Sequence, residues 1–133
     1  MFARRPTILA ALTTLVLPMS VAHAQRIYWT GPGAVPRANL DGSNAEIAIP
    51  NTSSGLALDL IEGKIYFAGG SPLRIQRANL DGSDVQDVVS VYVHNVRSIA
   101  LDLLHQKIYW IDGWPYGIAL DLDIGKLYWA GRG

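Results

Sequence analysis

Apolar and polar residues alternate with a period of two along much of this chain. In the segment GLALDL, which starts at residue 55, Leu56, Leu58 and Leu60 fall on one side while Ala57 and Asp59 fall on the other. In KIYF, which starts at residue 64, the isoleucine and the phenylalanine share a side and the tyrosine takes the opposite one. Alternation of this kind predicts β-strands with apolar groups on one face.

Turn residues divide these segments into a unit that runs from Gly55 to Val91. Glu62-Gly63 and Asp81-Gly82 interrupt the apolar pattern, and Asp-Gly is a strong signal for a short hairpin. Each segment is too short for a helix. The unit therefore predicts four antiparallel strands, at 55–60, 64–69, 74–80 and 85–91.

Three phrases recur in a fixed order. RANLDGS occurs at 37–43 and 77–83, and IYW, IYF, IYW and LYW begin at residues 27, 65, 108 and 127. GLALDL, SIALDL and GIALDL begin at 55, 98 and 117. Phrases repeated about every 40 residues, with four strands in each unit, are typical of β-propeller blades.

These phrases are similar to the YWTD, or class B, repeat of the low-density lipoprotein receptor family. KIYF resembles the second strand of a family blade, RANLDGS the phrase that leads into the third hairpin, and GLALD the start of the next blade. The resemblance covers nearly all of 26–130. We assign a structural role to the recurring residues Tyr28, Trp29, Tyr66, Phe67, Tyr109, Trp110, Tyr128, Trp129, Asp41, Gly42, Asp81, Gly82, Asp59, Asp102, Asp121 and Asp112.

The chain departs from the family pattern in two ways. The aspartate that ends YWTD, which by resemblance ties blades together, is present only as Asp112, because glycines 31, 69 and 131 replace it elsewhere. The aromatic phrases are 38 and 43 residues apart at first, but Trp110 and Trp129 are separated by only 19. The third and fourth strands of one unit are therefore missing.

These observations predict an all-β fold, an incomplete YWTD-type β-propeller with about two and a half to three four-stranded antiparallel blades. A closed ring needs about four to eight blades. Three interpretations fit: a truncated or decayed relative of a longer propeller, several copies that complete a ring, or a composite last blade in which 97–110 pairs with 117–130. Open strand edges favour self-association.

The first 24 residues resemble a secretory signal peptide of the bacterial type. Arg4 and Arg5 precede an apolar run, and Ala22-His23-Ala24 suits cleavage before Gln25, which leaves 25–133 as a partial propeller domain. The chain is then exported to the periplasm or secreted, by the general or the twin-arginine route. No later segment is long and apolar enough to span a membrane.

Composition and charge limit the classes of partner that the chain can bind. Without Arg4 and Arg5, nine basic residues stand against eleven acidic ones, a net charge of −2 with no basic patch for nucleic acid. The chain has no cysteine, so no disulfide supports the small core. No catalytic motif is present, and we expect no cofactor and no metal site.

Candidate binding residues lie between the strands. Trp114 and Tyr116 fall in the shortened connection, and His94 falls in the link after the complete unit. His105 occupies a hairpin turn and is interpreted as a solvated residue. The chain is thus predicted to be an exported, non-enzymatic module that binds a protein or another extracellular ligand. The alternatives are a fragment without independent activity and a periplasmic propeller lyase or hydrolase.

Overall fold

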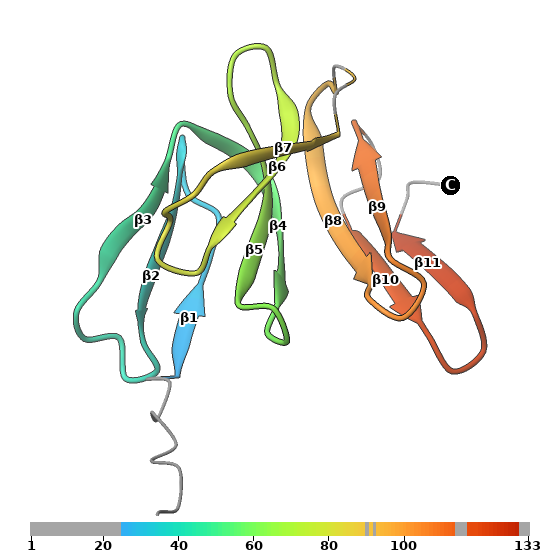
Figure 1. Cartoon of the computed structure of the whole chain (residues 1–133), viewed down its shortest axis with the longest axis horizontal. Helices are drawn as coiled ribbons and strands as arrows, with labels where there is room; N and C mark the ends of the chain where they lie inside the picture. Colours follow the sequence, from blue (N-terminus) through green and yellow to red (C-terminus); the bar gives the residue numbers. More distant parts are fainter. Residues whose placement is uncertain (1–24, 90, 92, 114–116, 131–133) are drawn as a thin grey trace, which may run out of the picture.

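The structure is a computed structural model that describes residues 25–133 apart from positions 90, 92, 114–116 and 131–133 (Figure 1). The predicted signal peptide at 1–24 lies outside the described residues. All regular structure in the described part of the chain is β-strand, in four antiparallel sheets. The strands are β1 (Arg26–Tyr28), β2 (Ala34–Asn39), β3 (Glu46–Pro50), β4 (Thr52–Asp59), β5 (Lys64–Gly69), β6 (Arg74–Asn79), β7 (Gln86–Val89), β8 (Val96–Asp102), β9 (Lys107–Asp112), β10 (Gly117–Asp121) and β11 (Lys126–Ala130).

The sheets follow the order of the repeats. Strands β1–β3 form blade 1, β4–β7 form the four-stranded blade 2, β8–β9 form half-blade 3 and β10–β11 form half-blade 4. The sheets stand next to one another in an open arc, with β8 beside both β4 and β10 (Figure 1). The predicted all-β, incomplete propeller is confirmed.

The two last hairpins do not form a composite blade. Strands β8–β9 and β10–β11 belong to separate two-stranded sheets, so the interpretation in which 97–110 and 117–130 share one sheet is wrong. Their first strands, β8 and β10, pack beside each other as inner strands of neighbouring blades. Each hairpin therefore occupies the inner half of its own blade.

The alternation predicted for blade 2 is present, because both faces of its sheet are covered. Leu56 and Leu58 on β4 and Ile65 and Phe67 on β5 belong to one cluster, whereas Ala57 packs against the other. The side chain of Phe67 is only 1% exposed. A sheet buried on both faces carries apolar residues on both, which fits β5, where Ile65 to Gly69 are all buried.

The two clusters are the two joints of the arc. The first cluster joins blade 1 to blade 2 through Val35, Ile49, Ile65, Phe67 and Ala78. The second joins blade 2 to β8 and the segment before it through Ala68, Ile75, Val93, Val96 and Ile99. Stacked repeats are stabilised by such interfaces between neighbours rather than by one central core.

One expectation about β4 is wrong. Leu60 does not continue the leucine face but lies in the turn after the strand, with 73% of its surface exposed. The carboxylate of Asp59 accepts hydrogen bonds from the backbone N–H groups of Ile61 and Glu62 at 2.9 and 3.0 Å. These bonds fold the chain into a turn directly after Asp59 and end the strand.

The Asp-Gly turns of blades 1 and 2 have the same geometry. Asp41 Oδ1 accepts hydrogen bonds from the backbone N–H and the hydroxyl of Ser43, at 2.9 and 2.6 Å. The turn at Asp81 and Ser83 repeats both bonds. Gly42 and Gly82 adopt φ values of 81° and 88°, a region that other residues enter with strain.

The surroundings of these two glycines differ. A Cβ added to Gly42 would meet nothing within 4 Å, whereas one added to Gly82 would overlap the Ala48 carbonyl oxygen of blade 1. The turn at Gly82 is thus pressed against strand β3. Glycine there permits both the turn and the close approach of the two blades.

We expect Gly42→Ala to lower the free energy of unfolding by about 1 kcal/mol through backbone strain alone. Gly82→Ala should lower it by roughly 3 kcal/mol, because overlap with Ala48 adds to the same strain. Urea unfolding of the two variants measures the difference. Equal losses would contradict the close contact between blades 1 and 2.

Candidate functional site

A pair of side chains on blade 1 ties it to blade 2. The hydroxyl of Tyr28 and the guanidinium of Arg37 both donate to the carbonyl oxygen of Leu80, at 2.9 and 2.8 Å. Tyr28 and Arg37 face each other across β1 and β2. One main-chain oxygen at the Asn-Leu-Asp-Gly turn of blade 2 thus receives two donors from the preceding blade.

Glu46 holds Arg37 in place for this contact. Its carboxylate oxygen Oε1 accepts hydrogen bonds from the guanidinium groups of Arg37 and Arg26, each at 2.8 Å. Burial by itself lowers the pKa of Arg37, but hydrogen bonds with Tyr28 and Glu46 outweigh it and the pKa is raised. The hydrogen bond from Arg37, with that from Arg26, lowers the pKa of Glu46. The guanidinium therefore stays charged and directed at Leu80.

The recurring aspartates at the strand ends accept backbone hydrogen bonds. Asp102 accepts from the backbone N–H of His105 at 3.0 Å and lies 2.8 Å from its ring Nδ1. Asp121 accepts from the backbone N–H groups of Asp123 and Ile124. With Asp59, these side chains shape the same turn in three blades, and their geometry is that of structural acceptors.

One end of the arc gathers three loops around His94. The backbone N–H of His94 donates to Asp112 Oδ2 at 3.0 Å, and its ring lies 3.9 Å from the same oxygen. Two backbone hydrogen bonds of 3.2 Å also link these loops. The N–H of Val93 donates to the carbonyl oxygen of Leu73, and the N–H of Gly113 donates to that of Asn95. Asp112 thus links the end of β9 to the segment between blade 2 and half-blade 3.

These loops border an open cleft of about 600 Å³. It is lined by Pro72, Leu73, Val93, His94 and Asn95. The His94 side chain is largely exposed, while Val93 is buried beneath it. The other sequence-predicted contact residues, Trp114 and Tyr116, lie outside the described residues. The sequence did not single out Leu73 or Asn95, although both lie in segments between strands.

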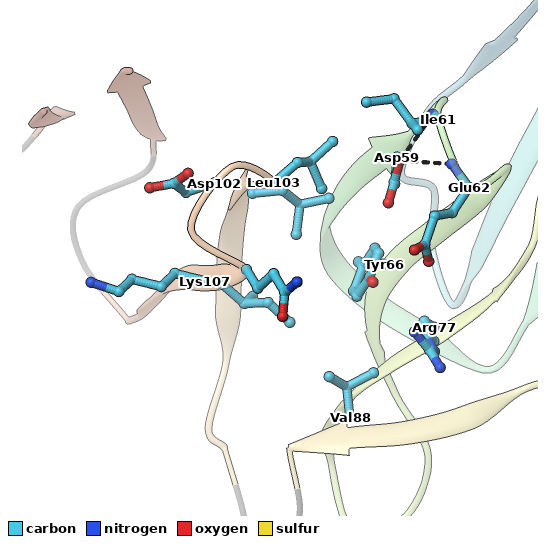
Figure 2. Close-up of a pocket in the computed structure, with 12 residues that line it drawn as sticks. Asp59, Ile61, Glu62, Tyr66, Arg77, Val88, Asp102, Leu103 and Lys107 are labelled. Carbon is cyan, nitrogen blue, oxygen red and sulfur yellow. Dashed lines mark hydrogen bonds between the residues drawn. The ribbon is translucent and has the colours of Figure 1, made fainter. Parts of the chain in front are cut away.

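A second groove of about 380 Å³ lies between blade 2 and half-blade 3 (Figure 2). Tyr66, Arg77 and Glu62 line it from blade 2, and Lys107 and Leu103 line it from the other side. A hydrogen bond with Tyr66 raises the pKa of Arg77. The sequence did not predict this groove, although the repeat carries a signal for it, because Tyr66 and Arg77 align with Tyr28 and Arg37 of blade 1.

The recurring aromatic residues differ in burial. Tyr66 and Phe67 are buried in blade 2, and Tyr109 and Trp110 are partly buried in half-blade 3. Trp29, Tyr128 and Trp129 are exposed, Trp129 by 66%. The same phrase therefore packs fully only where neighbouring sheets cover both of its faces.

No three histidine, aspartate or glutamate side chains within the described residues lie close enough together to hold a metal ion. The described residues likewise contain no helix that could cross a bilayer.

Comparison with known proteins agrees with the repeat. No family model matches the chain. The chain is 30% identical over 134 aligned positions to the low-density lipoprotein receptor-related protein 5-like protein of Homo sapiens, covering 78% of this chain and 53% of that protein. It is 29% identical over 136 positions to the vitellogenin receptor Yl of Drosophila melanogaster, covering 78% of this chain and 7% of that receptor.

A solved structure shares the fold. A chain from a nidogen–laminin complex superposes with a TM-score of 0.57 at 18% identity, over 65% of this chain and 36% of that chain. The chain thus spans about half the length of the first relative and less of the other two proteins.

Consecutive antiparallel blades, joined through their faces and built from one sequence unit, define a β-propeller repeat module. These relatives confirm the predicted resemblance of the chain to the low-density lipoprotein receptor class B, or YWTD, repeat family.

The lowered pKa values of the turn aspartates predict how the stability of the protein depends on pH. Hydrogen bonds from Ser43 and Ser83 lower the pKa values of Asp41 and Asp81, and a backbone bond from His105 lowers that of Asp102. A lowered folded-state pKa contributes stability that is complete above the unfolded pKa, near 3.8, and is lost as the pH falls through the folded value. We therefore expect stability to fall below about pH 4.

Asp102→Asn should make this fall less steep, because the amide oxygen still accepts from His105 but no longer titrates. The measurement is urea unfolding between pH 2 and 6. Asp123→Asn is the matched control, because the Asp123 carboxylate accepts no hydrogen bond within the described residues. An unchanged slope in Asp102→Asn would contradict the role of its carboxylate.

Proposed function

We propose that this chain is an exported, non-enzymatic β-propeller module that binds a protein or another extracellular ligand through the loop end around His94. The observation that carries the proposal is the cleft of Pro72, Leu73, Val93, His94 and Asn95, whose loops are held by three cross-loop hydrogen bonds. Loops fixed by a rigid scaffold are the usual site of recognition.

The cleft combines an apolar floor with polar groups at its rim. Leu73 and Val93 supply the floor, and His94 and Asn95 supply exposed donors and acceptors. Such a mixture suits a protein segment better than a nucleic acid, which would need a basic surface. Trp114 and Tyr116 lie one and three residues after Gly113 in the sequence, and we include them in the proposed contact surface.

The relatives support the same class of function. Two of them are a receptor and a receptor-related protein, and the solved nidogen chain forms part of a complex with laminin. Export of this chain is part of the proposal and rests on the leader-like sequence at 1–24.

Export predicts a specific mature terminus. Expressed with its first 24 residues, the chain should appear outside the cytoplasm and begin at Gln25, which mass spectrometry of the intact protein determines. Ala24→Leu should block cleavage, because signal peptidase requires a small residue there. Retention of Met1 in the wild-type chain, with the protein inside the cell, would contradict export.

Binding at the loop end can be tested with laminin as the probe. We expect saturable binding of laminin to the immobilised mature chain in surface plasmon resonance, weakened roughly tenfold by Asn95→Arg, because a long charged side chain would block the cleft. Asp123→Arg places the same charge on the β10–β11 turn and serves as the control.

Equal binding by wild-type and Asn95→Arg protein would argue against this surface. Absence of binding, together with absence of a cooperative thermal transition, would favour the alternative of a fragment without independent activity.

A further inference from the structure

The groove between blade 2 and half-blade 3 is bordered by Tyr66, Arg77 and Val88 of blade 2 and by the hairpin between β8 and β9 (Figure 2). Half-blade 3 lacks the two outer strands that blade 2 has. In blade 2, the stretch 70–95 between β5 and β8 contains β6 and β7. Between β9 and β10 only residues 113–116 remain. Four residues cannot form two further strands, since strands are usually five to six residues long.

The joint between blades 1 and 2 shows what normally fills this position. There, Tyr28 and Arg37 donate to the Leu80 carbonyl of the outer hairpin of blade 2. Tyr66 and Arg77 of blade 2 form the corresponding cross-strand pair on β5 and β6. Within the described residues, neither side chain donates to a backbone carbonyl, and Arg77 instead bonds to Gln86 at 3.2 Å.

Two lysines in equivalent positions also differ between blade 2 and half-blade 3. Lys64, at the start of β5, donates to Asn79 Oδ1 at 2.6 Å and lies 3.6 Å from Asp84, both in the outer hairpin of blade 2. Lys107 starts β9 in the same register, opposite Asp102 as Lys64 is opposite Asp59. Lys107 is exposed and forms no hydrogen bond or ion pair within the described part of the chain.

The backbone and the apolar side chains of β9 are also uncovered. Among the strands that the structure describes, β9 pairs with β8 alone, and its second edge has no strand partner there. Ile65 and Phe67, on a strand that has β6 beside it and blade 1 over its face, are almost fully buried, whereas their counterparts Ile108 and Trp110 are only partly buried. Tyr66, Arg77, Lys107 and Ile108 line the groove, and the free edge of β9 continues from it.

We propose that this groove binds a β-hairpin of the repeat's outer type, with an Asn-Leu-Asp-Gly turn, supplied by a partner protein. The first strand of the hairpin adds to the free edge of β9. A main-chain carbonyl at the turn accepts hydrogen bonds from Tyr66 and Arg77. The Asn of the turn and the Asp that follows its Gly-Ser, the counterparts of Asn79 and Asp84, bind Lys107. The mode of recognition is strand addition with specificity from fixed side chains.

The partner is a separate protein rather than a second copy of this chain. Both RANLDGS hairpins of this chain already lie in sheets, β2–β3 in blade 1 and β6–β7 in blade 2. Releasing either hairpin would expose Val35 and Ile49, or Ile75, all of which are buried. The groove is distinct from the loop-end cleft, so this inference does not depend on the proposed function.

The test uses a fluorescent peptide with the sequence of residues 74–89, RIQRANLDGSDVQDVV, and the full mature chain. We expect saturable binding in fluorescence anisotropy and none with a scrambled peptide. Tyr66→Phe, which removes only the hydroxyl, should weaken binding roughly tenfold. Tyr28→Phe is the matched control and should leave peptide affinity unchanged, because Tyr28 bonds to Leu80 within the chain.

A double-mutant cycle tests Lys107. Replacing the Asn and the second Asp of the peptide, the counterparts of Asn79 and Asp84, by alanine should weaken binding to the wild-type chain. The same peptide change should have little effect on Lys107→Met protein, since the lysine that pairs with these groups is gone. Equal effects on both proteins would overturn the assignment of Lys107.

A second measurement does not depend on the folding of a free peptide. A copy of residues 70–95 inserted after Gly113 should complete blade 3, raise the thermal midpoint and slow amide exchange along β9. Three results would overturn the proposal: equal peptide binding by wild-type and Tyr66→Phe protein, no binding by the folded chain together with an unchanged midpoint in the insertion variant, or a dimer of the chain that competes with the peptide.

Discussion

The fold depends on each sheet having a neighbour on both faces. Blade 2 meets this condition, since blade 1 covers one face through Val35 and Ile49 and β8 covers the other through Val96 and Ile99. Removing apolar surface from water is the main source of stability, and both buried clusters of the described residues lie where one sheet meets the next. The half-blades meet the condition only in part, which explains why identical phrases have different exposures along the chain.

Local features of the fold could be predicted from the sequence. The period-two pattern indicates β4 and β5, and the Asp-Gly turns at 41 and 81 form with the same bonds because their seven-residue phrases are identical. The number and order of strands follow from the repeat, so the all-β partial propeller was accessible without a structure. Hydrogen bonds within turns, such as that from the N–H of Ile61 to the Asp59 carboxylate, join residues only two positions apart, so they too follow from the local sequence.

Relations between blades could not be predicted in the same way. The bond from Tyr28 to Leu80 joins residues 52 positions apart and depends on how one sheet is rotated against the next. The separation of β8–β9 from β10–β11 likewise depends on which strand edges face each other. The groove at Tyr66 and Lys107 depends in the same way on how the β8–β9 hairpin lies against blade 2.

The joint at Leu80 has an evolutionary consequence. The atom that receives Tyr28 and Arg37 is a main-chain oxygen, which every amino acid supplies. Substitutions at position 80 can therefore change the side chain without removing the acceptor, whereas substitutions at 28 or 37 remove a donor. The hydrogen bonds of this joint therefore constrain residues 28 and 37, whereas position 80 is constrained by the packing of its side chain against the first cluster.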